Sequence, residues 1–185
     1  MSTQGPQARA LAKYIAGYSV RNIDRINHTI GRGAMWLSTA MVLVQFIVVI
    51  MRYAFGIGSI LMQEAIVYMH AVLFMMAAAD TLLADAHVRV DIFYTRMPPA
   101  RKAVVDLLGY VFLVMPFCVL LFSVSIDYVR LSWSVLEGSR ETSGIPAVFL
   151  LKTVILVFAM QLGLQAISGS IKAWARISQA EARAV

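Results

Sequence analysis

Three long stretches of the chain carry no charged residue, and they constrain the fold more than any other feature. They cover residues 33–51, 107–126 and 153–171, which are runs of 19, 20 and 19 residues. About 20 apolar residues in a helix cross the roughly 30 Å hydrocarbon core of a bilayer. The composition agrees, because 60% of the residues are hydrophobic and only 14% are charged, well below the charged share of a soluble domain. The sequence therefore predicts an all-α membrane protein.

A fourth span is predicted between residues 60 and 84. Only 15 uncharged residues separate Glu64 from Asp80, so we expect these two carboxylates near the two membrane interfaces. Pro116 lies inside the third span and is expected to kink it. Pro146 is expected in the first turn of the fourth span. The four transmembrane helices should cover approximately residues 31–53, 60–84, 103–131 and 145–171.

The N-terminal segment has a different pattern. Residues 1–8 are expected to be disordered, and residues 9–30 are expected to form an amphipathic helix, because large apolar residues recur there mostly at three- and four-residue steps with charged residues between them. Such a helix suits the surface of an anionic leaflet, and a soluble helix packed on a partner is the alternative. The segment lacks the long apolar region and cleavage site of a secretory signal.

The distribution of Lys and Arg predicts the orientation. Twelve of these residues lie on one side of four spans, namely Arg9, Lys13, Arg21, Arg25, Arg32, Arg89, Arg96, Arg101, Lys102, Lys172, Arg176 and Arg183. The other side carries only Arg52, Arg130 and Arg140, with Lys152 just inside the fourth span. The positive-inside rule therefore places both termini in the cytoplasm, with residues 172–185 as a cytoplasmic tail. The net charge of +6 does not indicate a nucleic-acid partner, because the basic residues flank the spans and form no single patch.

No enzyme is predicted, since the chain has no Ser–His–Asp set, no Gly-rich phosphate loop and no paired-cysteine metal motif. Ionisable residues inside a membrane are the remaining functional candidates. On a helical wheel His70, Ala77 and Asp80 share a face, and Glu64 lies off it. We expect this face to pack on another helix, and a transport path is the alternative. Because only His70 lies deep in a span, a bis-histidine haem site is not expected.

Two further charged residues lie near the outer ends of their spans. Glu64 is expected to be solvated or salt-bridged rather than to carry protons. Lys152 is expected to extend toward the interface, and its pairing with Glu64 or Asp127 is the sharper hypothesis. The single cysteine, Cys118, excludes an intrachain disulfide.

The stretch ADAHVRVDIF at residues 84–93 interrupts the apolar chain. As a metal site it is weak, because Asp85, His87 and Asp91 share no helical face with other ligands and Arg89 would repel a cation. As the inner end of the second span it is well explained. We expect His87, Arg89 and Asp91 to hold the inner connection in one shape, and we expect the Met97-Pro98-Pro99 sequence to stop any helix.

The order of several short motifs resembles a known family. Arg52-Tyr53 closes the first span and Gln63-Glu64 opens the second, and the next motifs are Ala77-Ala78-Ala79, AHVRVD at residues 86–91 and SGIPAVFLLKTVILVFAMQLGLQ at residues 143–165. Over about residues 30–165 this order resembles the DctQ-type small membrane subunit of tripartite ATP-independent periplasmic (TRAP) transporters. The start of the second span reads Leu61-Met62-Gln63-Glu64, where the family commonly has Trp followed by two Glu.

The resemblance implies a scaffold subunit in the inner membrane of a bacterial cell. Its partners would be a large DctM-type membrane subunit that holds the sodium ions and the substrate, a secreted DctP-type solute-binding protein, and membrane lipids. No cofactor is expected in this chain. Residues near the outer docking surface or its salt bridges would be Arg52, Glu64, Arg140, Glu141 and Lys152. Two alternatives stay open: a stand-alone proton-coupled transporter and the membrane anchor of a redox enzyme.

Overall fold

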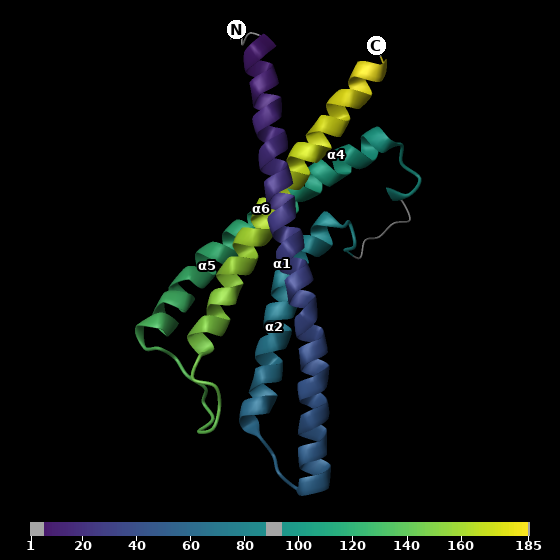
Figure 1. Ribbon diagram of the computed structural model, residues 1–185. Coiled ribbons are helices and arrows are strands. Elements are labelled where there is room, and N and C mark those ends of the chain that lie inside the picture. Colours follow the sequence, from purple (N-terminus) through teal and green to yellow (C-terminus); the bar gives the residue numbers. More distant parts are fainter. Residues whose placement is uncertain (1–5, 88–93, 185) are drawn as a thin grey trace.

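The computed structural model describes residues 6–87 and 94–184, with side chains described for residues 17–87 and 94–180. The elements are α1 (Pro6–Phe55), α2 (Ile60–Leu83), α4 (Pro99–Gly109), the π-helical turn η1 (Tyr110–Val114), α5 (Met115–Ser134) and α6 (Val148–Ala184) (Figure 1). Four helical segments are long and apolar enough to cross a membrane: Gly17–Ala54, Ile60–Leu83, Pro99–Ser134 and Val148–Ala180. The described residues contain no strand, and the prediction of an all-α protein with four spans is confirmed.

Helix α1 is longer than either segment expected for this part of the chain. The sequence predicted an amphipathic helix at residues 9–30 and a span at 31–53, and the structure joins them in one helix of 50 residues, about 75 Å long. The helix begins at Pro6, inside the segment for which disorder was expected. No proline lies between Pro6 and Phe55, so nothing in the backbone forces a break. The placement of residues 9–30 on a leaflet stays a prediction.

Helices α1 and α2 form an antiparallel hairpin. Gly56 ends α1 with a left-handed φ of 68°, and the Ser59 hydroxyl accepts a hydrogen bond from the Met62 N–H at 3.3 Å at the start of α2. At the other end of the hairpin the helices meet closely at Gly31, where a Cβ atom would come within 2.7 Å of Asp80 Cγ. A larger residue at position 31 would therefore push the two helices apart.

The third span is continuous from Pro99 to Ser134 but changes its winding before Pro116. The proline pair was expected to stop any helix. In the structure Pro98 is the N-cap of α4, so the helix begins at this pair. The Met115 N–H bonds to the Tyr110 carbonyl five residues back, which makes η1 a π-helical turn. A proline ring needs room against the preceding turn and supplies no N–H, and a wider turn gives that room. The distortion expected at Pro116 is thus a π-turn.

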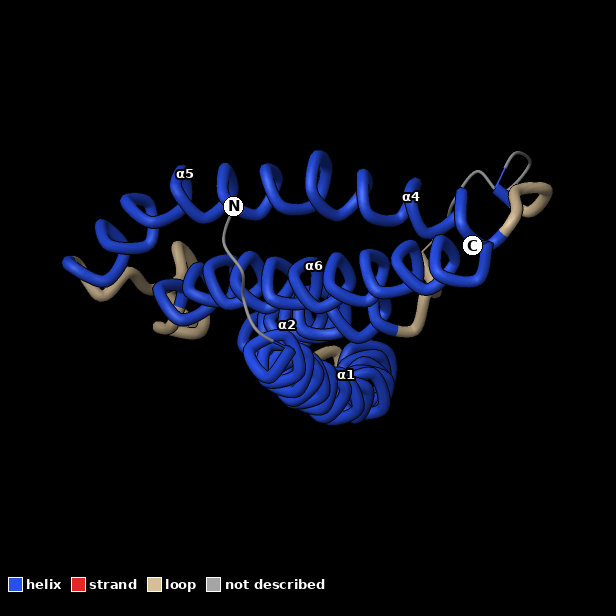
Figure 2. The backbone as a smooth tube through the Cα atoms, turned by 90° about the horizontal axis from the view of Figure 1, so that it is seen from above, coloured by secondary structure: helices blue, strands red, loops and turns tan. Residues whose placement is uncertain are grey.

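Helix α6 lies in the middle of the molecule. Viewed from above, it runs between the α1–α2 hairpin on one side and α4 and α5 on the other (Figure 2). In an apolar stretch of 18 residues from α6, 28% is buried within the chain, against 6–11% in the corresponding stretches of the other three spans. α6 begins two residues after Pro146, which therefore precedes the first turn, and it continues through the expected tail to Ala184. The start of α1 and the end of α6 lie at the same end of the molecule (Figure 1).

We name the two ends of the molecule by the orientation expected from its charges. The outer end holds the loops at residues 56–59 and 135–147, and the inner end holds the start of α4 and the end of α6.

Candidate functional site

The loop at residues 135–147, which we call the outer loop, is attached to α2 by a carboxylate. Glu64 Oε1 accepts a hydrogen bond from the Ser139 hydroxyl, and Glu64 Oε2 accepts one from the Ile145 backbone N–H at 2.6 Å. Gly144 lies against this contact, and a Cβ atom there would come within 2.6 Å of Glu64 Oε2. Glu64 therefore fixes both sides of the loop with one side chain.

A second carboxylate, Glu137, connects the outer loop to α5 and α6. Glu137 Oε2 accepts a hydrogen bond from the Ser132 hydroxyl at 2.7 Å and forms an ion pair with Lys152 Nζ. The hydrogen bond from Lys152, together with that from Ser132, lowers the pKa of Glu137 below the usual value for a glutamate. Lys152 Nζ also lies 3.9 Å from the centre of the Tyr128 ring. The loop is thus held by α2, α5 and α6 together.

Lys152 pairs with neither of the two carboxylates suggested as alternative partners. The sequence suggested Glu64 or Asp127, but Glu64 is bonded to the outer loop and Asp127 is exposed on α5. The actual partner, Glu137, lies in the loop, and its position depends on the path of the loop rather than on helix periodicity. The only sequence signal for it was an acidic residue in the connection that leads to Lys152.

The tip of the outer loop is exposed and carries both signs of charge. Arg140 and Glu141 are exposed, and the Glu141 N–H donates to the Ser139 hydroxyl at 3.1 Å. Leu136, in the same loop, is 64% exposed and has a left-handed φ of 46°. Arg52 is exposed in the last turn of α1, which also lies at the outer end. Four of the five docking candidates therefore gather at the outer loop, and Arg52 lies on the neighbouring hairpin.

The residues of the α2 face have separate surroundings. Asp80 contacts α1, where its Oδ1 lies 3.0 Å from His28 Nδ1. Ala77 is half-buried. His70 is exposed and stacks on Phe74 of the same helix, with the ring centres 6.5 Å apart. Among the side chains that the structure describes, Asp80 is the charged member of this face that contacts another helix.

At the inner end, α1 and α6 are joined by polar side chains that we call the inner clasp. Lys172 Nζ lies 2.6 Å from Asp24 Oδ2, and the Ser168 hydroxyl donates to Asp24 Oδ1 at 2.8 Å. Asn27 Nδ2 donates to Gln165 Oε1 at 2.7 Å, and both side chains are 2% exposed. Sequence reasoning missed this clasp. Its signal was the three- and four-residue spacing of Gln165, Ser168 and Lys172 on one face of an apolar helix.

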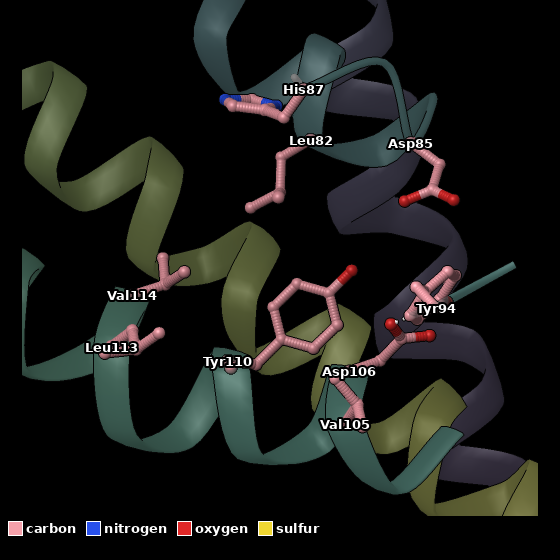
Figure 3. A pocket seen from close by; sticks show the side chains of 10 residues that line it. Leu82, Asp85, His87, Tyr94, Val105, Asp106, Tyr110, Leu113 and Val114 are labelled. Carbon is pink, nitrogen blue, oxygen red and sulfur yellow. Dashed lines mark hydrogen bonds between the residues drawn. The ribbon is translucent and has the colours of Figure 1, made fainter. Parts of the chain in front are cut away.

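A cavity of about 230 Å³ lies at the inner end between α2 and the start of the third span (Figure 3). Asp85, His87 and Tyr110 line it, and the Tyr94 hydroxyl donates to Asp106 at 2.8 Å beside them. Arg89 and Asp91, expected to fix this connection together with His87, lie outside the described residues. Their role stays a prediction. Over residues 17–87 and 94–180, no three His, Cys, Asp or Glu side chains gather as a metal site.

Comparison with protein families gives a match over more than half of the chain. The family described as "Tripartite ATP-independent periplasmic transporters, DctQ component" matches residues 41–176, which is more than half of the chain and includes α2 and the whole third span. Comparisons with curated proteins and with solved structures found no match. Proteins of this family are transporter components, and the four apolar helices make this chain a multi-pass membrane protein. The chain belongs to the DctQ family of tripartite ATP-independent periplasmic transporters.

Proposed function

We propose that the chain is the small scaffold subunit of a sodium-coupled, binding-protein-dependent uptake transporter in a bacterial inner membrane, with both termini cytoplasmic. It supports a large DctM-type subunit, in which the sodium ions and the substrate bind, and it helps to dock a DctP-type solute-binding protein. The observation that carries this proposal is the outer loop, which three helices hold in place while its charged tip stays exposed.

The scaffold role fits the way the helices use their surfaces. In an apolar stretch of 18 residues from each span, only 6–28% is buried within the chain. Much of the remaining surface is large and apolar, for example Val42, Phe74 and Leu120, which are between 63% and 70% exposed. Lipid and a membrane partner are the two surroundings that suit such residues. Polar groups such as Gln165 join helices within the chain instead.

The docking role fits the fixed shape of the outer loop. A loop that is already ordered loses less conformational entropy when a partner binds, so pre-organisation increases affinity. The Glu64 and Glu137 contacts provide this order, and the exposed Arg140 and Glu141 offer charges to a partner surface. Charged groups at the edge of an interface contribute mainly to association rate and specificity.

The test uses the complex of this chain with its large subunit in lipid nanodiscs. The dissociation constant of the solute-binding protein is measured with the wild-type chain and with Arg140→Ala/Glu141→Ala. We expect the double variant to weaken docking about tenfold, which corresponds to losing the charged contacts at the loop tip. Co-purification with the large subunit should not change. Arg96→Ala, an exposed arginine at the inner end, is the control and should dock normally.

Wild-type docking by the double variant would overturn the docking role. The scaffold role has its own measurement, uptake into proteoliposomes under an inward sodium gradient. The complete three-protein system should take up solute, and this chain alone should not. Solute uptake by the chain alone would favour the stand-alone transporter instead.

A further inference from the structure

The end of α5 places a leucine where helices usually have glycine. The helix ends at Ser134, and Leu136, two residues later, has a left-handed φ of 46°. The Leu136 N–H bonds to the Trp133 carbonyl at 3.2 Å. The next N–H, that of Glu137, bonds to the Ser132 carbonyl at 3.0 Å. These bonds define a Schellman motif, whose left-handed position is usually glycine because a Cβ atom is unfavourable there, so leucine is the more strained choice.

The left-handed conformation is held by the residue that follows it. Glu137 Oε2 accepts a hydrogen bond from the Ser132 hydroxyl and pairs with Lys152 Nζ. The Glu137 carbonyl also accepts a bond from the Phe149 N–H at 3.3 Å, at the start of α6. A strained residue persists when its surroundings fix it in this way. The path of the chain thus accounts for the conformation at position 136, but it does not account for a leucine side chain there.

The side chain of Leu136 is used little within the chain. Leu136 is 64% exposed, and Val135 before it is 66% exposed. Burial of a leucine side chain would offset the strain, but the described residues leave most of this side chain uncovered. Val135 and Leu136 form an exposed pair that we call the apolar pair. A large apolar side chain that is strained into position and left exposed points to a partner that covers it.

The apolar pair lies beyond the hydrocarbon core of the membrane. Residues 107–126 are uncharged, and Asp127 and Arg130 are both exposed where this run ends. Ser134, the last residue of α5, is about 10 Å from Asp127 along the helix axis, and the apolar pair comes after it. The loop that follows joins α5 to α6 at the end of the molecule opposite the two termini (Figure 1). Since exposed charges avoid acyl chains, the apolar pair faces the aqueous side rather than lipid tails.

We propose that the apolar pair is the contact on which the solute-binding protein docks, with the charged loop tip at the edge of the same interface. This inference rests on the docking role proposed above and adds the residues that would be buried. A protein interface combines an apolar centre with a polar rim, and the outer loop carries both, because Arg140 and Glu141 are exposed in it as well. A permanent contact with the large subunit would need a larger apolar surface.

The backbone conformation also suits this role. Leu136 is held in one orientation before the partner arrives, because Glu137 is bonded to α5 and α6. A side chain that is already placed loses less conformational entropy on docking. The strain at Leu136 therefore favours binding although it does not favour folding.

The test separates the side chain of Leu136 from its backbone conformation. Leu136→Gly removes the side chain and relieves the left-handed strain. Docking of the solute-binding protein is measured on the complex with the large subunit in lipid nanodiscs, and the melting temperature is measured on the full chain in micelles. We expect the dissociation constant to rise about tenfold. The melting temperature should stay equal or rise by up to about 4 °C, because glycine accepts the left-handed φ.

Two further variants separate apolar contact from loop flexibility. Leu136→Asn keeps the approximate size and suits a left-handed backbone but is polar, so it should weaken docking as Leu136→Gly does. Leu136→Met keeps the apolar volume and should dock with nearly the wild-type affinity. The matched control is Ile26→Asn, because Ile26 is 57% exposed at the inner end and its replacement should leave docking unchanged.

Several results would overturn the inference. Wild-type docking by Leu136→Gly and Leu136→Asn, with weakened docking by Arg140→Ala/Glu141→Ala, would refute the apolar contact and leave the docking role intact. Weak docking by Leu136→Gly but not by Leu136→Asn would show that loop order matters instead. Reduced co-purification of Leu136→Asn with the large subunit would assign the apolar pair to that subunit. A melting temperature several degrees lower in Leu136→Gly would show that the leucine supports the fold.

The docking role itself fails under a different result. If the wild-type complex does not bind the solute-binding protein, that role and the present inference are both refuted.

Discussion

The hydrogen bond between Asn27 and Gln165 gives the sharpest test of how α1 is held to α6. Both side chains are 2% exposed, and Asn27 Nδ2 donates to Gln165 Oε1 at 2.7 Å. Gln165 has a second bond, because its Nε2 lies 3.3 Å from Asp24 Oδ1. The two partners are therefore not equivalent, and replacing each by leucine, which is similar in size and apolar, should give different losses of stability.

The magnitude follows from what each change leaves behind. A polar bond between membrane helices contributes on average about 0.6 kcal/mol and at most about 1.7 kcal/mol. A buried polar group left without a partner costs a further 1–3 kcal/mol or so. Gln165→Leu leaves the buried Asn27 amide without the partner described for it, so we expect a loss of about 2–3 kcal/mol. Asn27→Leu removes the donor to Gln165 Oε1 but leaves the bond from Gln165 Nε2 to Asp24, so we expect a smaller loss of about 1–2 kcal/mol.

The measurement is the free energy of unfolding in mixed micelles for both single variants and the double variant. The double variant should lose less stability than the sum of the two single losses, because it leaves no orphaned amide. Ser38→Ala is the control. The exposed Ser38 hydroxyl donates to the Met35 carbonyl of its own helix, so its removal should cost almost nothing. Additive losses, or a larger loss for Asn27→Leu than for Gln165→Leu, would refute the reasoning.

Three further predictions concern other contacts. Gly169→Ala would bring a Cβ within 2.7 Å of Tyr110 Cε2 and should lower the free energy of unfolding by about 1–3 kcal/mol, with partial recovery when Tyr110→Leu is added. Gly144→Ala should displace Glu64 from the outer loop and weaken docking of the solute-binding protein while co-purification with the large subunit persists, and unchanged docking would contradict the role of that contact. Because the pairing with Lys152 lowers the pKa of Glu137 in the folded protein, its contribution to stability is fully present above the ordinary glutamate range and is lost as the pH falls through the lowered value. A thermal melt of Glu137→Gln should therefore depend less on pH between about 3 and 6 than the wild-type melt does.

The spans could be predicted from the sequence because hydrophobic length is a local property. Residues 33–51 and 153–171 lack charge whatever their neighbours are, and both lie in helices that can span a membrane. The continuity of α1 was missed because the pattern changes at Arg32 from amphipathic to apolar, although a change in surroundings does not require a break in the helix. Pro116 predicted a distortion, but its form as a π-turn depends on how the preceding turn packs.

The polar contacts were harder to predict, because most join residues far apart in the chain. Glu64 lies near the start of α2, whereas its bonds to Ser139 and Ile145 depend on how the outer loop folds back. The inner clasp was missed for a different reason. Asp24 and Asn27 lie in a segment assigned to the leaflet surface, so no partner on the fourth span was considered for them.

Because α1 is unbroken, the same helix reaches from one end of the protein to the other. The inner clasp holds the helix near Asn27, with about 42 Å of helix toward Phe55 and about 32 Å toward Pro6. A tilt of the whole helix by one degree about Asn27 would move the outer end by roughly 0.7 Å and the inner end by roughly 0.6 Å in the opposite direction. A tilt of the whole helix would therefore couple the loop that follows α1 to the inner end without any change in the fold of the helix.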